Sequence, residues 1–231
     1  MKRSEINAIM AESDAFARQH QFYLPPFAYW TPQEWRQKGP EVKDLVEYQL
    51  GWDITDFGSG NFSETGLFMF TIRNGHQKFL RTGLGKVYAE KLLIVDTNQV
   101  TPTHFHWTKM EDIINRGGGQ LVIQLYNSTN DDQLASTPVH AIIDSVIQTV
   151  PAGGIVRLNP GESITLPTRQ YHKFWAEGEK TLVVEVSVVN DDFTDNHFYE
   201  PVGRFAEIEE DVAPLHLLYN DYKNYYQPEQ K

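Results

Sequence analysis

The stretch His104-Phe105-His106-Trp107-Thr108-Lys109-Met110-Glu111 says more about the fold than any other part of the chain. Residues i and i+2 of a β-strand point to the same side, so His104 and His106 can direct both imidazoles at one point. Glu111 can return to that point if the chain kinks or bulges after Trp107. Imidazole and carboxylate ligands suit manganese, iron, cobalt, nickel or zinc, and the lack of a thiolate argues against a structural zinc site. The spacing therefore predicts a site for one divalent metal ion.

A second block of residues lies downstream and completes a pattern with the first. The two blocks resemble the paired motifs of the cupin superfamily, Gly-x5-His-x-His-x4-Glu-x6-Gly followed by Gly-x5-Pro-x-Gly-x2-His-x3-Asn. The residues of this chain that fall on the two patterns are His104, His106, Glu111, Gly118, Gly161, Pro167 and His172. The resemblance implies a β-barrel whose metal ligands are His104, His106, Glu111 and His172.

Three positions depart from the cupin motifs. Asn98 and Arg169 stand where the motifs have glycine, and Ala176 stands where the second motif has asparagine. Asparagine tolerates the left-handed backbone conformation better than most residues, so Asn98 is a mild change. Arg169 and Ala176 are not expected ligands. The departures therefore concern turn geometry rather than the metal site.

Composition excludes several classes of protein. The chain has 231 residues and a net charge of −11, which disfavours a nucleic acid or an anionic membrane as partner. It contains no cysteine, which excludes disulfides and fits a reducing compartment. Its apolar runs are short, and the first residues lack the apolar stretch of a secretory signal. We expect a soluble protein of the cytoplasm.

The hydrophobic period divides the chain into three parts. Residues 1–55 have helical spacing, with a start signal at Ser4 and a capping box in Thr31-Pro32-Gln33-Glu34. From residue 66 onward, apolar residues recur at every second position, as in a β-strand. Glycine-rich turns, including Gly117-Gly118-Gly119 and Glu177-Gly178, separate the expected strands, which are residues 67–73, 86–95, 100–107, 120–126, 139–148, 154–158, 163–166 and 182–189.

These patterns predict an all-β fold, a cupin double-stranded β-helix or jelly-roll barrel. We expect residues 1–55 to form a helical extension packed on the barrel and residues 56–190 to form the barrel with the metal site. Residues 191–231 are acidic and aromatic, and too apolar in places for disorder, so we expect a tail that wraps over the barrel. The whole is predicted to be a single domain.

Over nearly its whole length the chain is similar to the bacterial D-lyxose isomerases. The stretches that carry this similarity include residues 24–28 (LPPFA), 50–53 (LGWD), 88–91 (YAEK), 104–107 (HFHW), 111–119 (EDIINRGGG), 160–163 (PGES), 171–177 (YHKFWAE) and 185–192 (EVSVVNDD). The resemblance implies interconversion of D-lyxose with D-xylulose, and of D-mannose with D-fructose. It further implies a manganese cofactor, with cobalt, iron and zinc as alternatives, a free sugar as substrate, and a homodimer.

Aldose–ketose isomerisation needs a base, an acid and a stabilised oxyanion, and two residues are the first candidates for these roles. Lys109 lies between two expected ligands in the sequence, although a lysine there could equally be solvated. Glu185 interrupts the apolar strand of residues 182–189 and is expected to point inward. Second-tier candidates, for which turn chemistry or surface charge is the alternative explanation, are Asp191, Asp192, Arg204 and Glu207. Trp107, Phe174 and Trp175 flank the ligands and could bind the sugar, or they could simply be core residues.

Three other functions are compatible with the sequence. A phosphosugar isomerase would gather cations around a phosphate, and Arg81, Lys86 and Lys91 could supply them. A metal-dependent cupin dioxygenase could use the same ligands. A sugar-binding cupin without catalysis could keep the barrel, but it would not need the complete ligand set.

Overall fold

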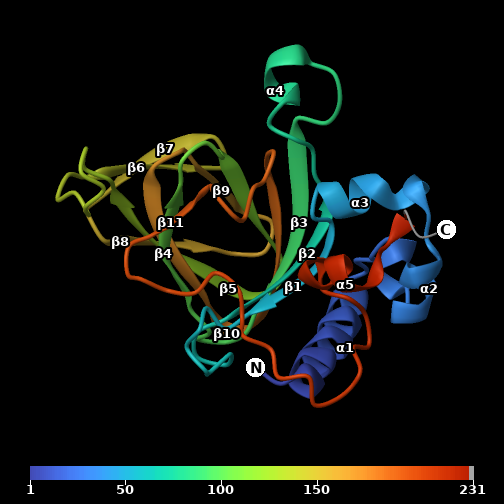
Figure 1. Cartoon of the computed structure of the whole chain (residues 1–231). Helices are drawn as coiled ribbons and strands as arrows, with labels where there is room; N and C mark the ends of the chain where they lie inside the picture. The colour runs from blue at the N-terminus through green and yellow to red at the C-terminus, as the bar shows by residue number, and fades with distance from the viewer. Residues whose placement is uncertain (229–231) are drawn as a thin grey trace.

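The computed structural model describes residues 1–228. The segments in which apolar residues alternate with polar ones, from about residue 67 onward, form a barrel of antiparallel strands (Figure 1). The strands are β1 (Gly51–Thr55), β2 (Leu67–Arg73), β3 (Tyr88–Val95), β4 (Thr101–His106), β5 (Glu111–Asn127), β6 (Val139–Ile143), β7 (Val146–Val150), β8 (Gly154–Leu158), β9 (Ser163–Leu166), β10 (Gln170–Val188) and β11 (Asn196–Phe198).

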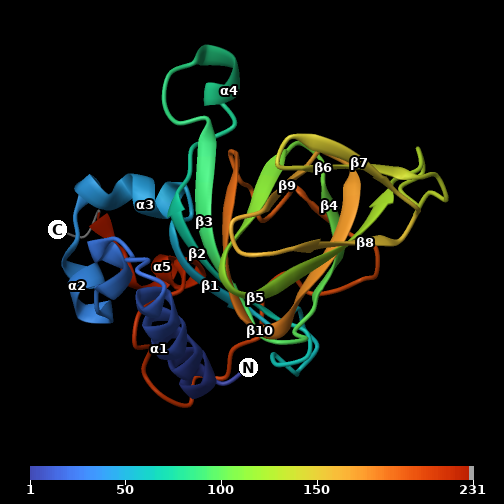
Figure 2. The same cartoon turned by 180° about the vertical axis from the view of Figure 1, so that it is seen from behind.

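The helices lie mostly on one side of the strands (Figures 1 and 2). The α-helices are α1 (Arg3–Gln19), α2 (Pro32–Gln37), α3 (Lys43–Glu47), α4 (Phe79–Thr82) and α5 (Tyr222–Tyr225), with single turns of 3-10 helix at η1 (Pro26–Tyr29), η2 (Pro40–Val42) and η3 (Tyr219–Asp221). None of the helices in the described part of the chain combines the length and the apolar character needed to cross a membrane.

Strands β5 and β10 organise the barrel. They pair antiparallel from Glu111–Ser187 to Asn127–Gln170, so each runs along the whole height of the sheet. One half of β10 also pairs with β3, and its other half pairs with β4. The sequence predicted only residues 120–126 and 182–189 as strands here. The longer strands place residues from both ends of β10 on the inside of one barrel.

Gly117-Gly118-Gly119 is a bulge within β5 and not the turn that the sequence predicts. The pairing of β5 with β10 shifts register there, and Glu177-Gly178 likewise lies inside β10. Gly118 has a φ of +89°, and a Cβ atom on it would lie 2.0 Å from the backbone oxygen of Lys180. The glycines therefore serve the close approach of two paired strands at a bend.

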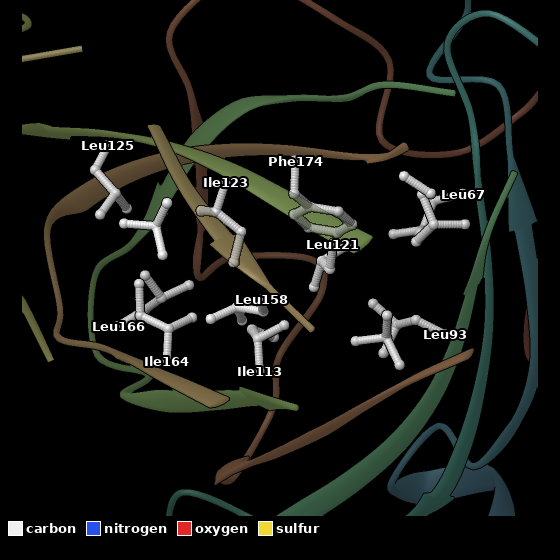
Figure 3. Packing of buried hydrophobic residues seen from close by; sticks show 14 of the residues in the cluster. Leu67, Leu93, Ile113, Leu121, Ile123, Leu125, Leu158, Ile164, Leu166 and Phe174 are labelled. Carbon is white, nitrogen blue, oxygen red and sulfur yellow. The ribbon is translucent and has the colours of Figure 1, made fainter. Parts of the chain in front are cut away.

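The interior of the barrel is a close-packed apolar core. It is built from alternate residues of β2, β3, β5, β8, β9 and β10, among them Leu93, Ile113, Leu121, Ile164 and Phe174 (Figure 3). Alternation along each strand puts these side chains on one face, as the period of two requires. This core supports the wall on which the polar site is built.

The helical part of the chain covers the outer face of the sheet at β1–β3 (Figures 1 and 2). Ile6 and Met10 of α1 pack in one cluster with Trp52, Phe68 and Phe70. The capping box at Thr31 is confirmed, because Thr31 and Glu34 exchange hydrogen bonds. Ser4 does not cap α1, since the helix begins at Arg3 and the Ser4 hydroxyl donates to Asp211 instead.

The tail lies along the helices and along the barrel mouth. Arg3 is buried and forms ion pairs with Glu210 and Asp221, which ties the start of the chain to its end. Two boundaries differ from the sequence-based ones. Strand β1 belongs to the sheet although it lies within residues 1–55, and β11 of the tail pairs with β4.

Two hairpins have no counterpart in the strands predicted from the sequence. Asp144 and Ser145 both have positive φ and turn the predicted strand of residues 139–148 into β6 and β7. Residues 74–87, between β2 and β3, form a hairpin around α4 that projects beyond the barrel (Figure 1). We call residues 74–87 the α4 hairpin.

Candidate metal centre and active site

Three imidazoles converge inside the barrel. His104 and His106 come from β4, and His172 comes from β10, where it pairs directly with His104. All three side chains are buried, and one ring nitrogen of each lies within 4.8 Å of the others. His104 and His172 are 68 positions apart in the sequence, yet the structure brings them together, as the two motifs predicted.

Backbone carbonyl groups fix the orientation of two of these rings. His104 Nδ1 donates to the Pro102 carbonyl at 2.7 Å, and His172 Nδ1 donates to the Gln170 carbonyl at 3.0 Å. A carbonyl can only accept, so Nδ1 carries the proton and Nε2 keeps its lone pair. This is the arrangement that orients histidine ligands in metal sites. His106 Nδ1 is buried without a hydrogen-bond partner in the described structure.

Glu111 supplies a fourth donor to the same place. Its Oε1 atom lies 3.3 Å from both His106 Nε2 and His172 Nε2. Donor atoms that bind one ion at about 2.1 Å and at right angles lie about 3 Å apart, so the observed spacing fits a shared ion. Three imidazoles and a carboxylate, all buried, are a donor set suited to a divalent transition metal.

Asp195 holds the turn that returns Glu111 to the histidines. Its carboxylate accepts hydrogen bonds from Thr108 N at 2.7 Å and from Lys109 N at 3.0 Å. The chain therefore does bend after Trp107, as the spacing predicted. No sequence pattern pointed to Asp195, because it lies more than eighty residues downstream of the turn.

The electrostatics of His104, Glu111 and His172 favour the protonation states that bind a metal ion. Burial lowers the pKa of His172 to about 4, and burial together with the neighbouring imidazoles places the pKa of His104 well below 6.5. Burial raises the pKa of Glu111, but Lys109, His106 and His172 together outweigh it, and the net pKa lies well below 4.5. At neutral pH the imidazoles of His104 and His172 are therefore neutral and the Glu111 carboxylate is ionised, which is the form that binds metal.

Lys109 and Glu185 are buried beside the metal ligands. Lys109 Nζ lies 2.6 Å from Glu111 Oε2 and 2.8 Å from Glu185 Oε1. Burial lowers the pKa of Lys109, but the two carboxylates outweigh that effect and raise it above its ordinary value. Lys109 is therefore a buried ammonium group that joins Glu185 to Glu111, and the solvated alternative for this lysine is excluded.

These residues line one cavity with an empty volume of about 440 Å³, its open mouth included. Beyond the groups already described, its polar lining residues are Lys91, Thr101, Asp192, Asn196 and Arg204. Its apolar lining residues are Phe57, Leu67, Met69, Leu93, Ile113, Phe174 and Phe198.

The second-tier candidates divide into two pairs. Asp192 and Arg204 line the cavity and lie 3.1 Å apart, and Arg204 also pairs with Asp53 at 2.6 Å. Asp191 instead accepts hydrogen bonds from the backbone of its own turn, so turn chemistry accounts for it. The side chain of Glu207 is exposed, and neither Asp191 nor Glu207 is among the cavity-lining residues in the described chain.

Only one of the three aromatic candidates faces the cavity. Phe174 lines it, whereas Trp107 and Trp175 do not. Alternation along a strand explains the difference, since Trp175 follows Phe174 and must point to the other face. Trp107 packs on the outside against Phe105 and is 38% exposed.

The cations required for a phosphate site do not gather. Lys91 is buried in the cavity, but Asn190 and Asp192 surround its ammonium group at 2.8 and 3.5 Å. Arg81 and Lys86 are exposed in the α4 hairpin and do not line the cavity. The described residues thus offer no cluster of unbalanced positive charge for a phosphate.

Several lining residues could not be identified from the sequence. Thr101 lies three residues before His104, and residues an odd number of positions apart on a regular strand point to opposite faces. Only an irregularity in β4 could therefore bring Thr101 to the cavity. Asn196 and Phe198 lie on β11, which is too short and too polar to stand out as a strand. No pattern in the sequence singled out these three positions.

The chain matches the family model described as D-lyxose isomerase over residues 1–222. It is 46% identical to a D-lyxose/D-mannose isomerase of Escherichia coli O157:H7, over 97% of this chain and all of that protein. It is also 46% identical to a D-lyxose/D-mannose isomerase of Serratia proteamaculans, over 96% of this chain and 98% of that protein.

Solved structures of lower identity share the fold. L-ribose isomerase of Cellulomonas parahominis aligns with a TM-score of 0.61 and 17% identity, over 90% of this chain and 98% of that one. L-ribose isomerase of Geodermatophilus obscurus aligns over the same shares with a TM-score of 0.62 and 15% identity. The expected barrel architecture is confirmed. From the match over nearly its whole length and from the close relatives, the chain belongs to the D-lyxose isomerase family.

Proposed function

We propose that this protein is a metal-dependent aldose–ketose isomerase that interconverts D-lyxose with D-xylulose and D-mannose with D-fructose. Family membership supports the reaction class, and the names of both close relatives support the two aldoses. The observation that carries the proposal is the position of Glu111, whose two carboxylate oxygens face the imidazoles on one side and Lys109 on the other.

His104, His106, Glu111 and His172 would hold the metal. We take manganese as the native ion, as the resemblance to the D-lyxose isomerases implies, with cobalt, iron and zinc as alternatives that the same nitrogen and oxygen donors suit. With four donors from the protein, the ion would still have room to bind oxygen atoms of the sugar. When bound, the ion supplies Lewis-acid stabilisation of negative charge on those oxygens.

Glu185 is the proposed base. It is buried, it lines the same cavity as the proposed ligands, and its Oε1 atom accepts a hydrogen bond from Lys109 Nζ at 2.8 Å. A carboxylate in this position can take the proton from C2 of the aldose and return it to C1, which is the transfer that the reaction requires.

Lys109 is proposed to supply positive charge and not to act as the base. Its raised pKa keeps it protonated at neutral pH, so it has no free electron pair for a proton. Its fixed ammonium group can stabilise negative charge on a sugar oxygen or donate a proton to it. Asp192 and Arg204 are proposed to contact the remaining hydroxyl groups of the sugar.

An assay without oxygen tests the reaction class. Purified protein loaded with manganese should form ketose from free D-lyxose and free D-mannose under nitrogen. A dioxygenase would be inactive there and would consume oxygen in air. Mannose 6-phosphate should be a poorer substrate than mannose, because Lys91, Lys109 and Arg204 of the cavity are each paired with carboxylates. A preference for the phosphate ester would instead support a phosphosugar isomerase.

A homodimer is the proposed assembly, with the α4 hairpin as its contact. Leu217 and Leu218 of the tail do not supply the surface, because both are buried against the molecule. In the hairpin region, Leu80, Leu84 and Tyr88 are 48%, 72% and 46% exposed. The hairpin is also cationic while the chain carries a net charge of −11, so its charge suits a second copy of this protein.

Light scattering after size exclusion tests the assembly. The native protein should have twice the mass of the chain, and Leu84→Asp should reduce it to the monomer mass. Val146→Asp, at an exposed position of β7, is the matched control and should leave a dimer. A dimer that persists in Leu84→Asp would place the contact elsewhere. The cytoplasmic location expected from the sequence stays a prediction.

A further inference from the structure

A β-bulge in β4 turns Thr101 into the cavity. His172 of β10 pairs with His104 of β4, but two residues further along β10 Phe174 pairs with Thr101, three residues back along β4. One extra residue therefore lies in β4 between the two pairs. Without it, strand alternation would place Thr101 on the face opposite to His104. Bulges of this kind re-aim side chains next to active sites.

The Thr101 hydroxyl is polar, buried and without a protein partner. The residue is 2% exposed and lines the cavity, and its Oγ1 atom has no hydrogen-bond partner in the described structure. A buried hydroxyl without a hydrogen bond costs free energy, on the order of 1–3 kcal/mol. Such a group in a binding cavity is satisfied by a ligand or by water.

We propose that Thr101 is a specificity-determining residue that binds the terminal hydroxyl group of the open-chain sugar, a role that rests on the proposed isomerase function. Thr101 and His172 are separated by two residues along the sheet, which is about 7 Å. This separation is comparable to the length of an open-chain pentose. A sugar whose reacting end lies at His104, Glu111 and His172 can therefore reach Thr101 with its other end.

The surroundings of Thr101 make its hydroxyl selective. Phe174 of β10 is the residue paired with Thr101. On the other side, Gly66 N donates a hydrogen bond to Val100 O, so Leu67 at the start of β2 lies beside Thr101. Phe174 and Leu67 point into the barrel interior (Figure 3). In an apolar environment a single hydroxyl acceptor discriminates strongly between a sugar that carries a matching hydroxyl and one that does not.

The stereochemistry of the substrates fits this placement. D-lyxose and D-mannose have the same configuration at C2, C3 and C4, so the reacting end and the middle of the two sugars are alike. They differ beyond C4, in the part of the sugar that would approach Thr101. The residue thus bears on the choice between pentose and hexose and not on the chemical step.

The test pairs a variant with a deoxy substrate. Thr101→Val keeps the shape of the side chain and removes the hydroxyl. In manganese-loaded protein it should lower kcat/KM for D-lyxose about tenfold, the effect of one neutral hydrogen bond. It should change kcat/KM for 5-deoxy-D-lyxose less than about twofold, since that sugar lacks the hydroxyl. Thr101→Ser should restore most of the activity on D-lyxose.

Thr103→Val is the matched control. Thr103 lies in the same bulge but does not line the cavity, so both substrates should keep their wild-type kcat/KM. An equal loss on D-lyxose and on 5-deoxy-D-lyxose would overturn the proposal and leave Thr101 a structural residue. No loss on either sugar would overturn it as well.

A binding measurement separates this proposal from the proposed function. D-arabinitol, the polyol obtained by reducing D-lyxose, can be titrated into the manganese-loaded protein by calorimetry. Thr101→Val should weaken its binding about tenfold. Weaker binding in the variant without any ketose formed by the wild type would reject the isomerase function and keep the Thr101 site. Unchanged binding would reject the Thr101 site.

Discussion

Lys109 Nζ donates a hydrogen bond of 2.8 Å to Glu185 Oε1 inside the barrel. Lys109 comes from the turn that carries the chain from β4 to β5, whereas Glu185 lies on β10. Because Lys109 also contacts Glu111, one ammonium group links the proposed base to the proposed metal ligands. The Lys109 side chain therefore fixes the position of the proposed base relative to the proposed metal ligands.

Replacing Glu185 by glutamine should separate catalysis from metal binding. An amide cannot take a proton from carbon, so we expect kcat for D-lyxose to fall by about 10²–10⁴, with metal content unchanged. Steady-state kinetics and metal analysis of the same sample measure both. Glu179→Gln, an exposed position of the same strand, is the control and should keep full activity. Full kcat in Glu185→Gln would remove this residue from the mechanism.

Replacing His172 by alanine should abolish metal retention and activity while the barrel stays folded. The substitution removes one of four donors, and the remaining three hold a divalent ion less tightly. Metal analysis after dialysis and circular dichroism check the two parts of this expectation. His140→Ala on β6, at an exposed position, should change neither. Unaltered manganese-dependent turnover in His172→Ala would show that the ion binds elsewhere.

The stability of the metal-free protein should fall as the pH drops from about 7 to about 4. Burial lowers the pKa of His172 to about 4, against 6.5 for an ordinary histidine. Between these values the unfolded chain binds a proton that the folded chain does not, so acid favours unfolding. For this residue the loss is on the order of 3 kcal/mol. Urea unfolding at several pH values measures it.

His172→Gln is the comparison for that experiment, because glutamine does not titrate. Its unfolding free energy should depend less steeply on pH between 4 and 7 than that of the wild type. Parallel curves for the two proteins would show that His172 does not titrate abnormally in the folded state.

Gly118→Ala should destabilise the protein much more than Gly178→Ala. Both glycines have positive φ, at +89° and +84°, so alanine costs about 1–2 kcal/mol of backbone strain at each. At Gly118 the new methyl group would also collide with the Lys180 carbonyl, whereas nothing lies within 4 Å of Gly178. Thermal unfolding compares the two, and equal losses would refute the close approach of β5 and β10.

Local patterns in the sequence were enough to predict that the four proposed metal ligands lie close together. His104 and His106 lie two residues apart on one strand, and Glu111 and His172 fall on the motif spacing. Asn98 and Arg169, which replace motif glycines, do adopt the left-handed conformation, at φ values of +63° and +61°. The bend after Trp107 was predictable, because no straight strand could bring Glu111 back.

The remaining site residues depend on features without a local signature. Thr101 faces the cavity only because β4 contains a bulge, and Asp195 reaches the turn at Lys109 from the tail. Trp107 and Trp175 are close to the ligands in sequence, but strand alternation turns them outward. Three consecutive glycines at residues 117–119 suggested a turn, but glycine is equally common at a bulge within a strand, and the sequence does not distinguish the two.

Manganese titration of the metal-free protein, followed by a D-lyxose assay, tests the central claim most directly. After chelation the protein should produce no ketose. Activity should return in proportion to added manganese and reach its maximum at one ion per chain. Ketose formation by fully chelated protein, or one ion bound per chain without any isomerisation of D-lyxose, would contradict the account.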